Sequence, residues 1–176
     1  MDVDVVHTAD LGPDGRADLH GLLDLAYGDD FTDADWEHAL GGMHALARDG
    51  GALVGHAALV ARRLLHGGRA LRAGYVEAVA VHPAHRRRGV AGAVMDPVER
   101  LARGGHEVGA LGSSEMALAF YAGRGWQLWR GPLHALTPSG IVETPDERGG
   151  IHVLPTDVPL DLDGDLTCDW RDGDVW

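Results

Sequence analysis

Residues 77–94 constrain the fold of this chain more than any other stretch, because they combine a strand pattern, a turn and the start of a helix. Val79 and Val81 alternate with small residues, which is typical of a half-buried strand. Pro83 ends that strand, since its nitrogen cannot donate to a strand ladder. The next segment, Arg-Arg-Arg-Gly-Val-Ala-Gly at 86–92, opens a helix with a valine at every fourth position. The stretch therefore predicts a strand–turn–helix unit.

The turn before this helix combines features that bind an anion. Its glycines and alanine leave backbone N–H groups uncovered, and the helix dipole adds positive potential at this end. Three consecutive arginines, 86–88, lie on the same turn. Together these features predict a pyrophosphate site. A run of surface arginines before an ordinary helix is the alternative, and the position of the motif directly after a strand favours the anion site.

The composition predicts one globular domain over residues 1–176. The chain is long enough to bury a core, and 45% of its residues are hydrophobic. It has no run of 18 apolar residues and no N-terminal signal pattern, so we expect no membrane segment. A single cysteine, Cys168, excludes an internal disulfide and suits a reducing compartment, which predicts a cytoplasmic location.

The net charge of −12 is unevenly distributed along the chain. Residues 60–90 contain seven arginines and one acid, Glu77, whereas residues 141–176 contain ten acids and two arginines. This asymmetry predicts an anionic partner for the middle of the chain and a cationic partner for the tail. A solvated acidic face is the alternative for the tail. The small basic patch and the acidic balance argue against binding to nucleic acid.

Periodicity and turn residues predict a mixed sheet with flanking helices, in the α/β class. Gly41 and Gly42 weaken the second predicted helix, and Pro97 is unusual inside the third. The expected strands are 3–8, 52–65, 69–82, 108–111 and 151–154, with a hairpin of 126–129 and 133–137. The expected helices are 13–26, 33–47, 89–103 and 114–123, and 138–150 is expected to be a loop.

Two side chains are candidates for acid–base chemistry. Glu77 is the only acid between residues 50 and 95 and lies in an apolar segment, where a carboxylate is costly without a partner or a role. We interpret it as a base that acts through a water, the alternative being an exposed strand residue. Tyr121 ends a short helix in the sequence Phe-Tyr-Ala-Gly-Arg-Gly-Trp, so it is either a core aromatic or a proton donor.

Other chemistries are poorly supported by the sequence. Cys168 has no neighbouring histidine and lies in an acidic stretch, which raises a thiol pKa. Ser113 and Ser114 do not form the Gly-x-Ser-x-Gly motif of hydrolases. Asp161 to Asp165 resemble a calcium loop, but the glycine has the wrong offset and no glutamate closes the loop. We therefore expect no metal site.

The strand–turn–helix unit resembles the acetyl-CoA-binding motif of the GNAT acetyltransferases, Gln/Arg-x-x-Gly-x-Gly/Ala. The resemblance implies a GNAT fold, with a mostly antiparallel mixed sheet whose V-shaped splay holds acetyl-CoA. It also implies that Tyr121 lies near the CoA sulfur and protonates the departing thiolate. The implied contacts are Val79, Ala80 and Val81 for the pantetheine arm, and Arg86, Arg87, Arg88, Gly89, Val90, Ala91 and Gly92 for the pyrophosphate.

Two further segments, 28–46 and 168–176, resemble the aminoglycoside 2'-N-acetyltransferases of actinobacteria, and this resemblance runs over nearly the whole chain. It implies direct acetyl transfer in a ternary complex and a homodimer. Glu147 stands where relatives have aspartate, and Gly112 where they often have serine, which implies an altered drug preference. The residues implied to contact or lie near the drug are Asp30, Asp35, Glu77, Ala78, Gly112, Asp146, Glu147, Asp174 and Trp176.

Two other functions remain open at this stage. A GNAT enzyme that acetylates another amine, such as a cell-wall precursor or a metabolite, would share every CoA feature and differ only in the acidic residues. A binding module without catalysis would hold CoA or a drug without turnover. The presence of both Glu77 and Tyr121 argues against the second alternative.

Overall fold

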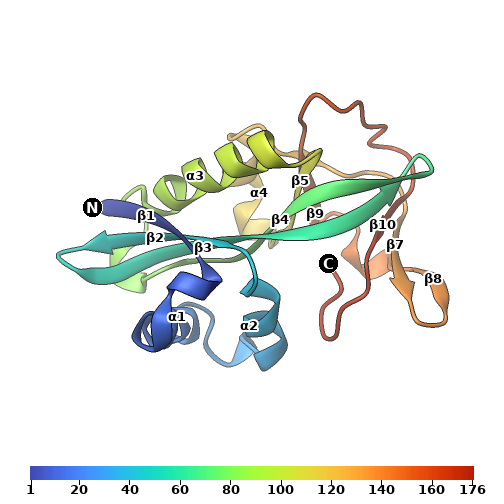
Figure 1. Ribbon diagram of the computed structural model, residues 1–176. Helices are drawn as coiled ribbons and strands as arrows, with labels where there is room; N and C mark the ends of the chain where they lie inside the picture. Colours follow the sequence, from blue (N-terminus) through green and yellow to red (C-terminus); the bar gives the residue numbers. More distant parts are fainter. The chain divides into compact units, whose positions relative to one another are not determined.

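The chain divides into two units, and two long consecutive strands, β3 (Ala52–His66) and β4 (Arg69–Val81), contribute residues to both. The computed structural model describes residues 1–176 (Figure 1). The first unit comprises residues 1–60 and 76–101, and the second comprises 61–75 and 102–176. Because the chain passes from one unit to the other within β3, β4 and helix α3 (Val90–Gly105), the units are interleaved in sequence. The expectation of one domain stays a prediction.

The first unit is a helix-covered sheet of β1, β2 and the first part of β3. β1 pairs with β2 and β2 pairs with β3, both antiparallel. Helices α1 and α2 lie on one face of these strands and α3 on the other (Figure 1). The remaining elements are β1 (Asp2–His7), β2 (Met43–Asp49), α1 (Gly12–Tyr27), α2 (Asp33–Ala39) and short 3-10 turns at Thr8–Asp10, Gly28–Asp30 and Pro83–His85.

The register of β2 and β3 decides which side chains face each helix layer. Leu46 is opposite His56, and Leu46 belongs to a buried cluster with leucines of α1. Their neighbours Ala47 and Gly55 are also opposite one another and face the other way. A Cβ on Gly55 would lie 2.4 Å from a methyl carbon of Val90, so the glycine allows α3 to approach β3 closely.

The prediction of one helix over residues 33–47 is wrong. Helix α2 ends at Ala39, and Leu40 already has an extended backbone. Gly41 then takes a φ of 81°, and a Cβ on Gly42 would lie 2.2 Å from the carbonyl oxygen of Leu59. The two glycines thus mark a chain reversal against β3 and do not merely bend a helix. Residues after them form β2, because both of its neighbours offer an antiparallel ladder.

In the second unit the strand order is β6-β9-β5-β4-β3-β10-β7-β8. The β4–β5 and β10–β7 pairs are parallel, whereas β5–β9, β6–β9, β7–β8 and β10–β3 are antiparallel. The predicted mixed, mostly antiparallel α/β sheet is therefore confirmed. The elements are β5 (Val108–Gly112), β6 (Gln127–Leu128), β7 (Leu133–Thr137), β8 (Gly140–Glu143), β9 (Ile151–Leu154), β10 (Leu166–Cys168), α4 (Leu118–Ala122) and 3-10 turns at Glu115–Ala117 and Pro145–Glu147.

The predicted hairpin of 126–129 with 133–137 is also wrong. β6 pairs with β9, and β7 instead forms a hairpin with β8. Strand β8 lies inside the segment 138–150, which was expected to be a loop. The register places Leu136 opposite Ile141 and Ala135 opposite Val142. The turn between β7 and β8 has two residues and is shorter than the connection between 126–129 and 133–137, so it favours pairing of β7 with β8.

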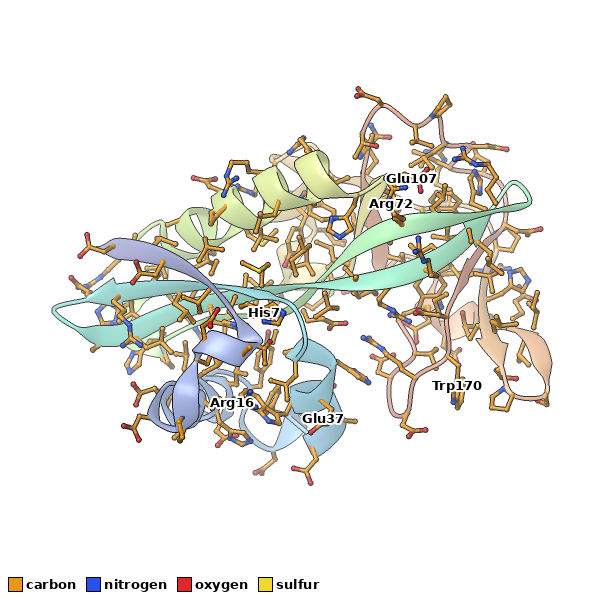
Figure 2. The ribbon with its side chains drawn as sticks, in the orientation of Figure 1. His7, Arg16, Glu37, Arg72, Glu107 and Trp170 are labelled. Carbon is orange, nitrogen blue, oxygen red and sulfur yellow. The ribbon has the colours of Figure 1, made fainter.

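Parallel pairing between β4 and β5 ends at Tyr75 and Ala110, although β4 continues to Val81. Glu107, just before β5, fixes the start of this pairing. Its carboxylate accepts from the backbone N–H of Arg72 at 2.9 Å and from the Arg69 guanidinium at 2.9 Å, and Figure 2 shows Arg72 and Glu107 side by side. The Arg72 amide holds the pKa of Glu107 below its usual value. The V-shaped splay of the sheet stays a prediction.

Two fully buried histidines lie inside the first unit. His44 and His56 are both 0% exposed and are joined by a 2.9 Å hydrogen bond. Burial lowers the pKa of His44 to about 4, with further contributions from the positive charges of His7 and Arg16, both labelled in Figure 2. Burial, followed by the neighbouring His44, lowers the pKa of His56 to about 3. Both imidazoles are therefore neutral in the folded protein at neutral pH.

These two histidines predict a loss of stability on acidification. The unfolded histidine has a pKa of 6.5, so below that pH the unfolded chain binds protons that the folded chain refuses. Their contribution is complete above pH 6.5 and is lost as the pH falls towards about 4 and about 3. At about pH 5 the loss is about 2 kcal/mol for each histidine. Urea unfolding at about pH 7 and about pH 5 measures it. Equal stabilities at the two pH values would contradict the prediction.

Strand β5 offers a matched pair of glycines whose surroundings differ. A Cβ on Gly109 would lie 2.9 Å from Leu154 Cβ and 3.3 Å from the Trp126 ring. On Gly112 it would meet only ordinary contacts, with Ile151 and the Tyr75 hydroxyl both at 3.7 Å. Gly109→Ala should therefore destabilise the protein by about 1–3 kcal/mol, because the core cannot accept the methyl group. Gly112→Ala should stay within about 0.5 kcal/mol of the parent. Thermal unfolding of the two variants checks the difference, and equal effects would refute it.

Candidate functional site

The end of β4 carries the expected base and the expected pantetheine contacts. Glu77, Ala78, Val79 and Val81 are half-buried, while Ala80 is 3% exposed and packs in the leucine cluster beneath α1. The strand is irregular here, because Ala78 has a φ of 51°. Two side chains reach its carbonyl groups: His56 Nδ1 donates to the Ala78 oxygen at 2.8 Å, and the Tyr27 hydroxyl donates to the Val79 oxygen at 2.6 Å.

The predicted pyrophosphate turn follows β4 in the first unit. Residues 86–89 are exposed, and helix α3 begins at Val90, which is buried together with Val94 and Val98. Arg87 and Gly89 take positive φ values of 61° and 80°, so the backbone reverses tightly before the helix. The first N–H groups of an α-helix have no acceptor within the helix. The residues present thus fit an anionic phosphate group, with the amides at the helix start as donors.

One of the three arginines of this turn is already engaged with α1. Arg86 donates to the carbonyl oxygen of Ala26 at 3.3 Å, and its own backbone N–H donates to Pro83. Arg87 and Arg88 are exposed. The guanidinium of Arg86 therefore joins the turn to the end of α1, whereas the other two are placed at the surface.

Two acids of the first unit were expected near the acceptor. Asp30 is exposed in the 3-10 turn after α1. Asp35 forms a capping box at the start of α2: it accepts from the Thr32 backbone N–H at 2.9 Å and from the Thr32 hydroxyl at 2.8 Å. Asp35 thus has a clear structural function at the helix start, where a carboxylate is favoured.

Tyr121 belongs to the second unit. It is 6% exposed on α4, and its ring lies edge-on to Phe120 and Trp126, with centroids 5.2 and 6.1 Å away. The ring of His152 is 6.4 Å away. Its aromatic packing fixes the side chain firmly, as both the core and the proton-donor interpretations require.

The second unit gathers the acids of the late part of the chain. Asp146 and Glu147 lie in the 3-10 turn at 145–147, and Asp174 lies in the tail. Burial raises the pKa of Glu147 above its ordinary value, and the negative charges of Asp174 and then Asp146 raise it further. The three carboxylates thus form one cluster of like charge, in which a cation would relieve the repulsion.

Buried hydrogen bonds hold the tail in place. Trp176 is 4% exposed, and its indole N–H donates to the Thr144 hydroxyl at 2.9 Å, next to the turn that carries Glu147. Arg62 donates to the Asp169 carboxylate at 2.7 Å and to the Val175 carbonyl oxygen at 2.7 Å. These contacts dock the end of the chain against the acidic turn.

A second arginine completes this anchoring. Arg171 donates to the backbone oxygens of Asp174 and Trp176 at 2.7 and 2.8 Å. Both Arg62 and Arg171 also lie over the ring of Tyr75, at 4.6 and 5.4 Å from its centroid. Neither arginine was predicted from the sequence as a contact of the tail. The signal for Arg62 was a charged side chain within the apolar strand 52–65, at a position that is 6% exposed.

Gly112 lies beside the docked tail. A Cβ at this position would be 3.7 Å from the Tyr75 hydroxyl and 4.0 Å from the Trp176 carbonyl carbon. The second unit therefore brings together five of the predicted acceptor contacts, namely Gly112, Asp146, Glu147, Asp174 and Trp176. Asp30, Asp35, Glu77 and Ala78 belong to the first unit with the expected CoA contacts.

The remaining candidates play other parts. Cys168 is fully buried, donates to the Val175 carbonyl oxygen at 3.3 Å, and has its pKa raised to about 11 by burial. It is therefore a poor nucleophile. Asp163, from the calcium-like segment, accepts two hydrogen bonds from Arg130 at 2.7 and 2.6 Å. No cluster of three metal-ligating side chains is found, and no helix has the length and apolar character to cross a bilayer.

Comparisons with known proteins show the family of this chain. A family model described as an acetyltransferase (GNAT) domain matches residues 13–129. The chain is 51% identical over 176 residues to an aminoglycoside 2'-N-acetyltransferase of Mycolicibacterium fortuitum, covering 98% of this chain and 90% of that protein.

Two solved structures show the fold. A GNAT family acetyltransferase from Brucella melitensis in complex with acetyl-CoA has a TM-score of 0.60 at 16% identity, covering 94% of both chains. Eis1 from Mycobacterium abscessus has a TM-score of 0.61 at 20% identity, but this chain spans only 33% of its length and the match covers 76% of this chain. The predicted GNAT fold is confirmed. The chain therefore belongs to the GNAT family of acetyltransferases, which transfer an acetyl group from acetyl-CoA.

Proposed function

We propose that this enzyme acetylates the 2'-amino group of aminoglycosides. The observation that carries the proposal is the cluster of Asp146, Glu147 and Asp174, in which burial and then the neighbouring negative charges raise the pKa of Glu147. Such a cluster favours a ligand with several ammonium groups, each making charge-assisted hydrogen bonds. The name and 51% identity of the Mycolicibacterium fortuitum protein support the same acceptor.

The residues of the first unit support the donor half of the reaction. We propose that the amides at the start of α3 bind the pyrophosphate of acetyl-CoA, from Arg86 through Gly92, and that Val79 to Val81 bind the pantetheine arm. The turn's positive φ values and exposed arginines suit the first contact. At Val79 the carbonyl oxygen already accepts from Tyr27, so we propose that this hydrogen bond is shared or exchanged when the donor binds.

We propose direct transfer in a ternary complex. The acceptor arrives as an ammonium ion, and Glu77 removes a proton through a water so that nitrogen gains a lone pair. The nitrogen then attacks the thioester carbonyl, forming a C–N bond. The C–S bond breaks, Tyr121 donates its hydroxyl proton to the thiolate, and the second proton leaves the nitrogen and restores the Tyr121 hydroxyl. The products are an amide and CoA with a free thiol, and no covalent enzyme intermediate is needed, in keeping with the buried Cys168.

An enzyme for a second class of acceptor would differ from this proposal only in its acidic residues. A GNAT enzyme for a cell-wall precursor or a metabolite would use the same donor residues, so the observation that favours aminoglycosides is the carboxylate cluster. A cytoplasmic location and a homodimer also belong to the proposal. They rest on the composition and on the family resemblance respectively.

The choice of acceptor tests the proposal directly. We expect acetyl-CoA to release CoA thiol with tobramycin or kanamycin B, which carry an amine at 2', and not with kanamycin A, which has a hydroxyl there. Thiol release measured with a chromogenic disulfide, together with the mass of the product, checks this. Turnover with all three drugs would remove the 2' assignment. Binding of acetyl-CoA without any turnover would point to another amine.

Two conservative variants separate the proposed acid from the proposed base. Glu77→Gln should lower kcat by about 10²-fold or more and remove the acidic limb of the pH profile of kcat/KM. Tyr121→Phe keeps the aromatic packing, should lower kcat by a similar factor, and should remove the basic limb instead. Steady-state rates across pH measure both. A profile that keeps both limbs in either variant would contradict the role given to that residue, with acetyl-CoA binding as the control for folding.

A further inference from the structure

A buried chain of hydrogen bonds ends on the backbone beside Glu77, and the proposed mechanism does not use it. His56 on β3 donates from Nδ1 to the Ala78 carbonyl oxygen at 2.8 Å. His44 on β2 lies 2.9 Å away, with its Nδ1 against His56 Nε2. The Nε2 of His44 lies 2.7 Å from the hydroxyl of Thr8. The hydrogen bonds thus link Thr8, directly after β1, through His44 on β2 and His56 on β3 to Ala78 on β4, all within the first unit.

The carbonyl at one end fixes the direction of the whole chain. A carbonyl oxygen can only accept, so the proton of neutral His56 lies on Nδ1 and its Nε2 is an acceptor. His44 must then donate from Nδ1, which leaves its Nε2 as an acceptor for the Thr8 hydroxyl at 2.7 Å, a shorter contact than the 3.2 Å from that hydroxyl to the Gly42 carbonyl oxygen. Thr8 in turn accepts from the Gly41 backbone N–H at 2.9 Å. Both histidines are therefore in the Nδ1–H form, with every donor pointing towards Ala78.

The backbone at Ala78 needs such support. With a φ of 51° it lies in the left-handed region, which non-glycine residues rarely adopt and which carries a steric penalty. Surrounding structure must hold such a conformation in place. The residues on either side of it are Glu77, the proposed base, and Val79, a proposed pantetheine contact. A change of backbone conformation at Ala78 would therefore redirect both.

We propose that His56 is a positioning residue for acetyl transfer: its Nδ1–H, backed by His44 and Thr8, holds Ala78 in the left-handed conformation that sets the direction of Glu77. This inference rests on the proposed role of Glu77. His56 touches neither substrate nor reacting atoms and acts through the backbone. Its full burial and its lowered pKa keep it neutral and in one tautomer over the working pH range.

Two amide side chains distinguish a donor at Nδ1 from a polar group of similar size. In His56→Asn the amide N–H can replace Nδ1–H, whereas in His56→Gln the amide reaches the position of Nε2. We expect His56→Asn to retain at least about a third of the parent kcat. In His56→Gln, kcat should fall about 10- to 100-fold, since small misplacements of catalytic groups have effects of this size. The acidic limb of the pH profile should move in Gln only. A purely structural defect would scale the profile and leave its limbs in place.

A matched control comes from the second unit. His66 Nδ1 donates to the Asp165 carbonyl oxygen at 2.8 Å, the same distance as in the His56 bond. His66→Gln should leave kcat and the pH profile within about twofold of the parent, since Asp165 has no place in the proposed chemistry. An equal loss in His66→Gln would show that any imidazole-to-carbonyl bond has this effect and would overturn the proposal. So would equal losses in the Asn and Gln variants of His56.

NMR on the same proteins separates this inference from the proposed function. Imidazole ¹⁵N shifts of the parent should show both histidines as Nδ1–H, and the ¹³Cα and ¹³Cβ shifts of Ala78 should show a left-handed residue in the parent and in His56→Asn only. An Nε2–H form, or an unchanged Ala78 in His56→Gln, overturns the inference. These chemical shifts are measured without an acceptor, so they test the inference about His56 even if the parent acetylates no aminoglycoside. That outcome would overturn only the proposed function.

Discussion

The left-handed backbone at Ala78 is the constraint around which the donor residues of the first unit are arranged. Such a conformation costs about 1–2 kcal/mol for a residue with a Cβ. It interrupts β4 between Glu77 and Val79, so each neighbour departs from the regular alternation of a strand. Hydrogen bonds from His56 to the Ala78 carbonyl oxygen and from Tyr27 to that of Val79 hold the chain at the irregularity and directly after it. An uninterrupted strand would need neither side chain.

The second unit addresses a different physical problem, which is to hold like charges close together. Burial raises the pKa of Glu147, and the negative charges of Asp174 and then Asp146 raise it further, so the ionised form of Glu147 is disfavoured at this position. The arginines that secure the tail bind mainly backbone oxygens: Arg171 reaches those of Asp174 and Trp176, and Arg62 reaches that of Val175. They fix the position of the acidic side chains through the main chain, so that a cationic ligand can supply the countercharge.

The local patterns of the sequence predicted the strand–turn–helix unit well. The strand, turn and helix over residues 77–94 follow from alternation, Pro83 and the valine spacing, all of which act between near neighbours. The same reasoning failed at 33–47, because Trp36, Leu40 and Met43 fit a helical face and only the tertiary contact of Gly42 with Leu59 shows the reversal. Arg62 and His56 were missed for a related reason. Their partners lie up to 113 and 22 residues away, and no local pattern encodes such pairs.

The two positions at which the acceptor preference is proposed to differ lie apart, in sequence, from the proposed base and the pyrophosphate turn. The residues in which this chain was expected to depart from its relatives, Gly112 and Glu147, both belong to the second unit, while Glu77 and the pyrophosphate turn belong to the first. A side chain larger than hydrogen fits at Gly112 without displacing its neighbours. Glu147 is longer than aspartate by one methylene group and lies in a short turn. If these two residues contact the acceptor as proposed, changes at them would alter which cation binds while β4 and the start of α3 keep their geometry.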